Sequence, residues 1–318
     1  MKTLASVLLL SLSMAAQTIT TFRVGTYGTG VNAINASGEL VGQFYGGTNG
    51  EEVYGFYRDA QGVVHRMGAT YDPLAINAGG EIAGRDNAQQ SNGFYKPAGG
   101  AITQFLKYRT PFVAGVTDQA WIAGAYAPSP GEWQGFLMSP QGVVTNITPQ
   151  MGMVVVAGVN QSQQVVGDMA ANSNGDGAQG FLWDQGKLTD LNVTGADVTE
   201  PLGIGTSGEV VGTWQDGSGQ WHGFWGTVGG GFASYDAPGA QETALHAVNA
   251  SGMILGSWID AEKLSHTFLL SPQGTMTEIT VPNAIQVWPG GINDPGEVAG
   301  SWIAKGKKAR SEGFVLIP

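Results

Sequence analysis

Hydrophobic and polar positions follow one short pattern that recurs seven times along the chain. Each copy has a β-branched residue, then Asn or a substitute, a short polar turn that usually contains Gly, and finally aliphatic-x-Gly. The last Gly stands seven residues after the Asn position in every copy, at Gly42, Gly84, Gly124, Gly167, Gly212, Gly256 and Gly300. These glycines are 40 to 45 residues apart, and a regular period of this length is the signature of a repeat architecture.

The copy that spans residues 75–105 shows which elements one repeat predicts. A first strand ends at Ile76, a turn follows at residues 77–80, and a second strand begins at Glu81. A Gly-Phe step at residues 93–94 marks a third strand, and a second turn leads into a fourth strand at residues 102–105. Short strands separated by regular turn signals predict a four-stranded antiparallel meander and an all-β protein.

The second strand is apolar on both of its faces. In the sixth copy, strand alternation places Ile254, Gly256 and Trp258 on one side and Leu255 on the other. Because both faces must be covered, we expect each sheet to stack between two like neighbours in a seven-bladed β-propeller. The predicted propeller domain is residues 17–318, with repeats starting near residues 31, 73, 113, 156, 201, 245 and 289. An open β-solenoid is the alternative.

The two ends of the sequence predict how the ring closes. The seventh copy stops after its third strand, at residues 314–318, and contains no fourth. The segment Ile19–Phe22 matches the fourth strand at residues 102–105 position for position. We therefore expect the N-terminal strand to complete the last blade, which an open solenoid would leave unexplained.

Composition narrows the class of protein. The 51 glycines fall at fixed repeat positions and the chain has no cysteine, so packing rather than disulfides must stabilise it. The net charge of −11 argues against partners that are nucleic acids or anionic membranes. It is compatible with a cation, a glycan or a protein partner, and we expect a monomer.

Residues 1–16 have the pattern of a secretory signal peptide. Lys2 precedes a short apolar run at residues 7–12, and small residues follow at Ser13, Ala15 and Ala16. The sequence therefore predicts a secreted, extracellular protein, with an uncleaved N-terminal helix as the alternative. No second apolar segment follows, so we expect no membrane anchor.

The repeat, combined with a polar residue before the third-strand Phe, resembles the HAF-repeat family of probable extracellular bacterial proteins. The His of that signature stands at His222 and His266, although Gly or Thr replaces its Ala. The resemblance implies secretion and a repeat fold, and it supplies no catalytic residues. The same position is polar in all seven copies, which predicts a structural hydrogen bond.

Candidate binding residues lie near the loops between second and third strands, which should emerge on one face. Aromatic side chains beside connections can stack on sugars or anchor a protein partner, and acidic side chains recur in these loops. The candidates for ligand binding are Trp133, Trp221, Trp288, Glu132, Asp216 and Asp260. A solvated rim with a solubilising role is the alternative.

One loop resembles the first half of a calcium-binding loop. Asn172, Asn174 and Asp176 place oxygen ligands at alternate positions, and Gly177 follows. The twelfth position is Trp183 rather than Glu, so Ca²⁺ is a candidate ligand on partial evidence and no other cofactor is expected.

No catalytic motif occurs in the sequence, which favours a non-enzymatic binding scaffold. Two alternatives stay open: a carbohydrate-active enzyme that uses paired loop carboxylates, and a structural protein of an extracellular surface or matrix.

Overall fold

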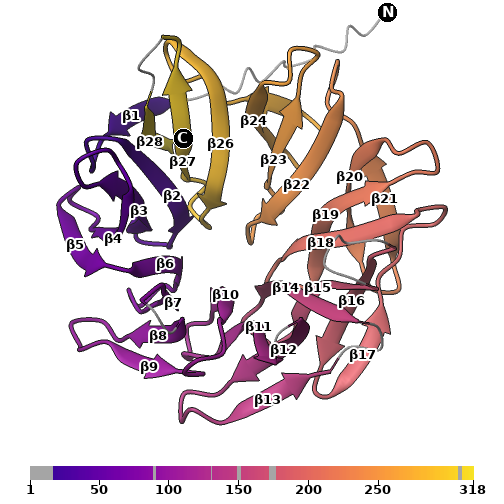
Figure 1. Cartoon of the computed structure of the whole chain (residues 1–318). Coiled ribbons are helices and arrows are strands. Elements are labelled where there is room, and N and C mark those ends of the chain that lie inside the picture. The colour runs from indigo at the N-terminus through magenta and orange to yellow at the C-terminus, as the bar shows by residue number, and fades with distance from the viewer. Residues whose placement is uncertain (1–16, 89–90, 130, 149–151, 172–176, 307–309) are drawn as a thin grey trace, which may run out of the picture.

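The computed structural model describes residues 17–88, 91–129, 131–148, 152–171, 177–306 and 310–318. These residues form 28 strands and no helix, and the strands make seven four-stranded antiparallel sheets. The sheets stand around a common axis as the blades of a propeller (Figure 1). The predicted seven-bladed β-propeller is thereby confirmed. No helix in the described part of the chain is long and apolar enough to cross a membrane.

Each blade follows the chain order of its strands. Blade 1 contains β2 (Gly28–Ile34), β3 (Leu40–Gly46), β4 (Glu52–Arg58) and β5 (Val64–Ala69), and blade 2 contains β6 (Tyr71–Ile76), β7 (Ile82–Asp86), β8 (Asn92–Lys96) and β9 (Thr103–Phe105). Blade 3 contains β10 (Phe112–Val116), β11 (Ile122–Ser129), β12 (Glu132–Met138) and β13 (Val144–Ile147), and blade 4 contains β14 (Met153–Val159), β15 (Val165–Ala170), β16 (Gln179–Asp184) and β17 (Lys187–Asp190).

The remaining blades repeat this order. Blade 5 contains β18 (Val198–Ile204), β19 (Glu209–Gln215), β20 (Trp221–Thr227) and β21 (Gly231–Tyr235), and blade 6 contains β22 (Glu242–Val248), β23 (Ile254–Ile259), β24 (Ser265–Leu270) and β25 (Met276–Glu278). Blade 7 contains β26 (Ala284–Ile292), β27 (Val298–Ala304), β28 (Ser311–Ile317) and β1 (Thr18–Phe22).

The first strand of every blade lies nearest the axis and the fourth lies at the periphery (Figure 1). Because the strands alternate in direction, the loops between second and third strands emerge on the same face as the connections between blades. We call this side of the molecule the loop face.

The N-terminal strand completes the last blade, as predicted. β1 pairs antiparallel with β28, with Thr18 opposite Ile317 and Phe22 opposite Gly313. Ile19 packs against the core beside blade 7, and the Phe22 ring meets Phe56 edge-on across the junction with blade 1. β1 therefore joins the first and last blades of the ring.

The repeat Gly and the third-strand Phe form one packing unit in each blade. The two residues face each other across the second and third strands, as Gly42 does with Phe56. A β-bulge in the first strand lies opposite each repeat Gly, and the Phe is 0% exposed in all seven blades. A Cβ on Gly42 would lie 2.1 Å from the Gly30 carbonyl oxygen and 2.8 Å from the Phe56 ring. Only glycine fits between the bulged strand and the aromatic ring.

The Asn of the repeat closes its own turn and also reaches the next blade. Asn35 Oδ1 accepts from the backbone nitrogens of Ser37 and Glu39, and its Nδ2 donates to the backbone oxygen of Asn77 at 2.9 Å. Five such bonds link blade to blade, with donors at Asn35, Asn77, Asn160, Asn249 and Asn293. The Asn293 bond runs to Asn35 and so spans the junction between the last and first blades. Thr117 and Gly205 take the same position and have no side-chain amide to donate.

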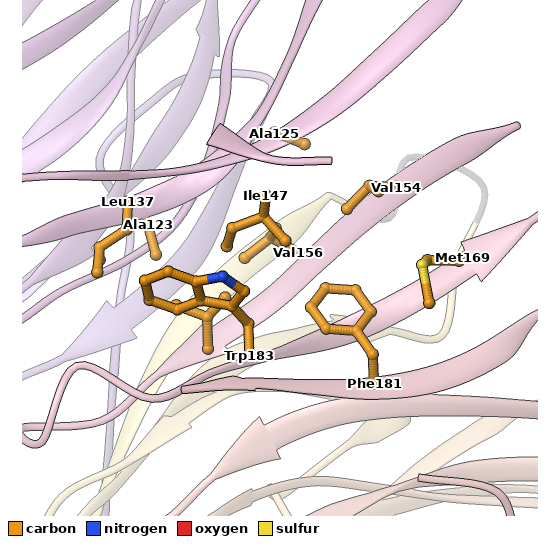
Figure 2. Close-up of a cluster of buried hydrophobic side chains, with 10 residues drawn as sticks. Ala123, Ala125, Leu137, Ile147, Val154, Val156, Met169, Phe181 and Trp183 are labelled. Atoms are coloured by element: carbon orange, nitrogen blue, oxygen red, sulfur yellow. The ribbon is translucent and has the colours of Figure 1, made fainter. Parts of the chain in front are cut away.

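Hydrophobic cores lie between neighbouring blades. The cluster in Figure 2 combines Ala123, Leu137 and Ile147 of blade 3 with Val154 and Phe181 of blade 4. Each sheet is therefore covered on both faces, as its two-sided apolar pattern predicted.

We expect removal of the closing strand to destabilise the whole ring. A variant that lacks residues 1–23 should melt on the order of 10 °C below one that lacks only residues 1–16, because it loses the β1–β28 pairing and uncovers two inter-blade cores. Thermal unfolding followed by circular dichroism measures the difference. Equal melting temperatures would contradict closure by β1.

The side-chain amide at the Asn position should contribute more to the stability of the protein than its turn contacts alone would. Asn77→Ala removes the bond to the Thr117 backbone oxygen as well as the turn contacts of a side chain that is 4% exposed, at a cost of about 2–4 kcal/mol. Thr117→Ala is the matched control, because the bond that Thr117 makes through its hydroxyl stays within its own turn. Urea titration of both variants tests this, and equal losses would show that the inter-blade bond adds nothing.

Candidate functional site

A large cavity opens on the loop face between blades 2, 3 and 4. It has a volume of about 540 Å³, and we call it the apolar cleft. Its walls include Arg85, Thr110, Phe112, Trp133, Met153 and Val155. Trp133 is the second residue of β12, beside the loop that precedes this strand, as its sequence position suggested.

Phe112 and Val155 are exposed although they belong to first strands. Their side chains are 40% and 46% exposed, and both line the apolar cleft. They take equivalent places in their blades, five residues before the Asn position. We call this place the inner position. Its seven occupants are Gly30, Asp72, Phe112, Val155, Glu200, Ala244 and Trp288.

Arg85 is the charged member of the apolar cleft. Its Nε donates to Asp72 Oδ2 at 3.0 Å, and Nη2 lies 2.9 Å from the same oxygen. Asp72 is 2% exposed, whereas the Arg85 side chain is 40% exposed. Burial raises the pKa of Asp72, and the neighbouring Arg85 opposes this shift. The buried Asp72 carboxylate thus holds the Nε and Nη2 edge of the Arg85 guanidinium in place.

A second cavity, of about 270 Å³, lies between blades 5 and 6, and we call it the acidic cleft. Glu200, Glu242, Trp221 and Trp258 contribute to its walls. Ser257, also in the wall, lies 2.7 Å from Nε2 of His246 through its hydroxyl. Carboxylates beside indole rings suit a hydroxyl-rich or cationic ligand.

Glu200 in the acidic cleft has a buried acidic neighbour. Burial, together with the negative charge of Glu200, raises the pKa of Asp168 to about 7; Asp168 is 7% exposed. Burial also raises the pKa of Glu200. Neither carboxylate has an ion-pair partner among the described residues. Near neutral pH the two groups therefore hold fewer than two negative charges.

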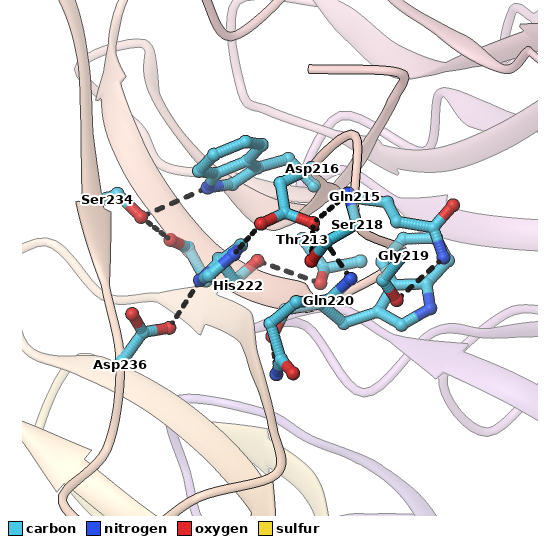
Figure 3. Close-up of polar contacts among 12 residues, drawn as sticks. Thr213, Gln215, Asp216, Ser218, Gly219, Gln220, His222, Ser234 and Asp236 are labelled. Atoms are coloured by element: carbon cyan, nitrogen blue, oxygen red, sulfur yellow. Dashed lines mark hydrogen bonds and ion pairs between the residues drawn. The ribbon is translucent and has the colours of Figure 1, made fainter. Parts of the chain in front are cut away.

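His222 and His266 stand in matching polar networks at the loop face. The His222 ring stacks on Trp214 with centroids 4.6 Å apart, and its Nδ1 lies 2.8 Å from Asp236 Oδ1 (Figure 3). Its Nε2 lies 3.5 Å from Asp216 Oδ2. In the next blade, His266 stacks on Trp258 at 4.2 Å and lies 3.0 Å from both Asp260 and Glu278. In these two copies the position therefore forms side-chain contacts with carboxylates rather than with the backbone.

Asp216 and Asp260 close turns within their own blades. Asp216 Oδ1 accepts from the Ser218 hydroxyl at 2.7 Å and from two backbone nitrogens, and these bonds lower its pKa to about 2 (Figure 3). Asp260 Oδ1 accepts from the backbone nitrogen of Leu264 at 2.8 Å. Both side chains are committed to turn geometry and to the histidine networks.

The other predicted residues are dispersed. Trp133 lines the apolar cleft and Trp221 the acidic cleft, so the two do not share a site. Glu132 is exposed at the start of β12. Trp288 lies within β26 rather than beside a connection, and it is 36% exposed at the inner position.

The proposed calcium ligands Asn172, Asn174 and Asp176 lie outside the described residues. Among the residues that are described, no group of three or more acidic, His or Cys side chains could hold a metal ion.

Sequence reasoning missed Arg85, Phe112, Val155, Asp168 and Glu200. A signal for three of them lay in the repeats, because the inner position follows no consensus while its neighbours do. Arg85 and Asp168 share another variable place, directly after the repeat Gly.

Solved structures share this architecture. A catalytically inactive virginiamycin B lyase from Staphylococcus aureus, solved with quinupristin, superposes with a TM-score of 0.60 at 12% identity, over 95% of this chain and 99% of its own. The β-propeller domain of the Trilobed protease from Pyrococcus furiosus, described as having an open velcro topology, gives 0.65 at 8% identity, over 91% and 95%. TolB from Acinetobacter baumannii gives 0.54 at 14% identity, over 88% and 80%. Such low identities establish the fold alone.

No family model matches the sequence. No curated protein matches it significantly either.

Asp168 should make stability depend on pH. Its folded pKa of about 7 exceeds its ordinary value of 3.8, so its contribution to stability is complete below about pH 4 and is lost as the pH rises to about 7. Asp168→Asn should therefore match the parent at pH 4 and melt several degrees higher at pH 8, with an upper limit of about 4 kcal/mol. Asp190→Asn, an exposed change in the same blade, is the control. If the difference in melting temperature between Asp168→Asn and the parent were the same at pH 4 and pH 8, the pKa of Asp168 would not be raised.

Proposed function

We propose that the protein is a secreted, monomeric and non-enzymatic binding propeller that takes a small, largely apolar ligand in the apolar cleft. The observation that carries this proposal is the exposure of Phe112 and Val155 inside a concavity of about 540 Å³. Exposed apolar side chains gathered in a concave site are typical of ligand pockets in soluble proteins. Export is supported by the signal-like pattern of residues 1–16.

The wall of the cleft suits an aromatic or aliphatic ligand. Phe112, Trp133, Met153 and Val155 offer two rings, a flexible thioether and a branched side chain from three strands. Covering the exposed part of Phe112 and Val155 would contribute up to about 1 kcal/mol each. Because these strands belong to rigid, fully paired sheets, the site needs little reorganisation on binding.

A second candidate is cleavage of a glycan in the acidic cleft. It is favoured by Glu200 and Glu242, which both line the acidic cleft, and burial raises the pKa of Glu200, as suits a general acid. Trp221 and Trp258 would provide stacking surfaces for sugar rings. Asp216, a loop carboxylate predicted to bind a ligand, is already engaged in its turn.

An uncharged fluorophore tests the apolar cleft. N-phenyl-1-naphthylamine should bind residues 17–318 with one saturable site, because the cleft offers one concave, largely apolar surface. Phe112→Asp should weaken this binding about tenfold or more, since it places a charge in the wall. Val143→Asp is the matched control, because Val143 is 64% exposed and does not line the cleft.

Equal affinities in the two variants would rule out the apolar cleft as the site. Release of reducing ends from a polysaccharide, abolished by Glu200→Gln, would instead establish the enzymatic candidate.

A further inference from the structure

We infer that the apolar cleft selects ligands that carry an anionic group, which Arg85 binds. This inference rests on the proposed function and names the chemical class of its ligand: a small amphipathic anion with an aromatic or aliphatic body and one carboxylate or sulfonate.

Arg85 keeps part of its guanidinium free. Its contacts with Asp72 use Nε and Nη2 and converge on one carboxylate oxygen. Nη1 has no hydrogen-bond partner among the described residues. A guanidinium presents five N–H donors in a fixed fork, so donors remain for an acceptor on the cleft side.

The salt bridge with Asp72 orients Arg85 for this role. Asp72 is 2% exposed and lies behind the guanidinium, where it also accepts from Asn32 Nδ2 at 3.4 Å. An arginine already held in place loses less side-chain freedom when it binds a ligand. The ligand would therefore contact guanidinium N–H donors that are already held in one orientation, rather than a mobile side chain.

The remaining polar groups of the cleft are neutral. Ser91 and Thr110 contribute hydroxyls, and no Asp or Glu is among its described lining residues. By contrast, Glu200 and Glu242 line the acidic cleft. The protein carries a net charge of −11. In the apolar cleft an anionic ligand would nevertheless contact the Arg85 guanidinium and no lining carboxylate.

Two probes with the same aromatic body separate charge from apolar binding. The sulfonate 8-anilinonaphthalene-1-sulfonate should bind about tenfold more tightly than the uncharged N-phenyl-1-naphthylamine. Added salt should weaken binding of the sulfonate probe and leave the affinity for the uncharged probe unchanged. Arg85→Gln should abolish the preference, with affinity for the uncharged probe within about twofold of the parent.

Two further variants keep the outcome interpretable. Lys187→Gln makes the same change in net charge on an outer strand and should leave both affinities unchanged. The double variant Asp72→Asn with Arg85→Gln avoids a buried unpaired carboxylate and should lose the preference while it folds normally.

Equal affinity of the parent for both probes, or an equal effect of Arg85→Gln on both, would overturn the inference while the proposed function stands. Failure of the uncharged probe to bind in the apolar cleft would overturn the proposed function itself.

Discussion

Each blade depends on one repeat glycine at which an added Cβ would collide with a backbone carbonyl, an aromatic ring or both. At Gly212, a Cβ would lie 2.3 Å from the Glu200 carbonyl oxygen and 2.6 Å from the Phe224 ring. The absent side chain leaves room for the bulge in the first strand and for the Phe ring, which is fully buried. Both contacts occur at Gly42, Gly84, Gly124, Gly212 and Gly300, while the nearest atoms are backbone at Gly167 and the Phe268 ring at Gly256. The blades therefore share one frame on which the other contacts of the ring are built.

Asparagine bonds link neighbouring blades at five of the seven junctions in the ring. Each Asn amide satisfies its own turn with Oδ1 and uses Nδ2 on the neighbouring blade, so one side chain serves local and global structure. The bond from Asn293 to Asn35 has the same geometry as those between consecutive blades, although 258 residues separate the partners. Together with β1, it makes the junction between the ends of the chain similar to the other junctions.

Internal repetition explains why the fold could be predicted from one sequence. Seven copies show which places tolerate no change, and those places, such as Gly84 and Phe94, are the ones that packing constrains. The candidate site was predicted less well, because repeat equivalence says nothing about which blades a cleft joins. Trp133 and Trp221 are equivalent in sequence and line different clefts, whereas Asp216 was predicted to bind a ligand and closes a turn.

The same constraint explains where function can vary. The repeat glycine needs only the backbone carbonyl of the inner position, as the contacts of Gly124 with Phe112 and of Gly212 with Glu200 show. The side chain at that position is therefore free to be apolar in one blade and acidic in another without disturbing the frame. The two clefts differ in polarity for this reason: Phe112 and Val155 make one wall apolar, and Glu200 makes the other acidic. Under the proposed function, these least repetitive positions of the innermost strands would set ligand specificity.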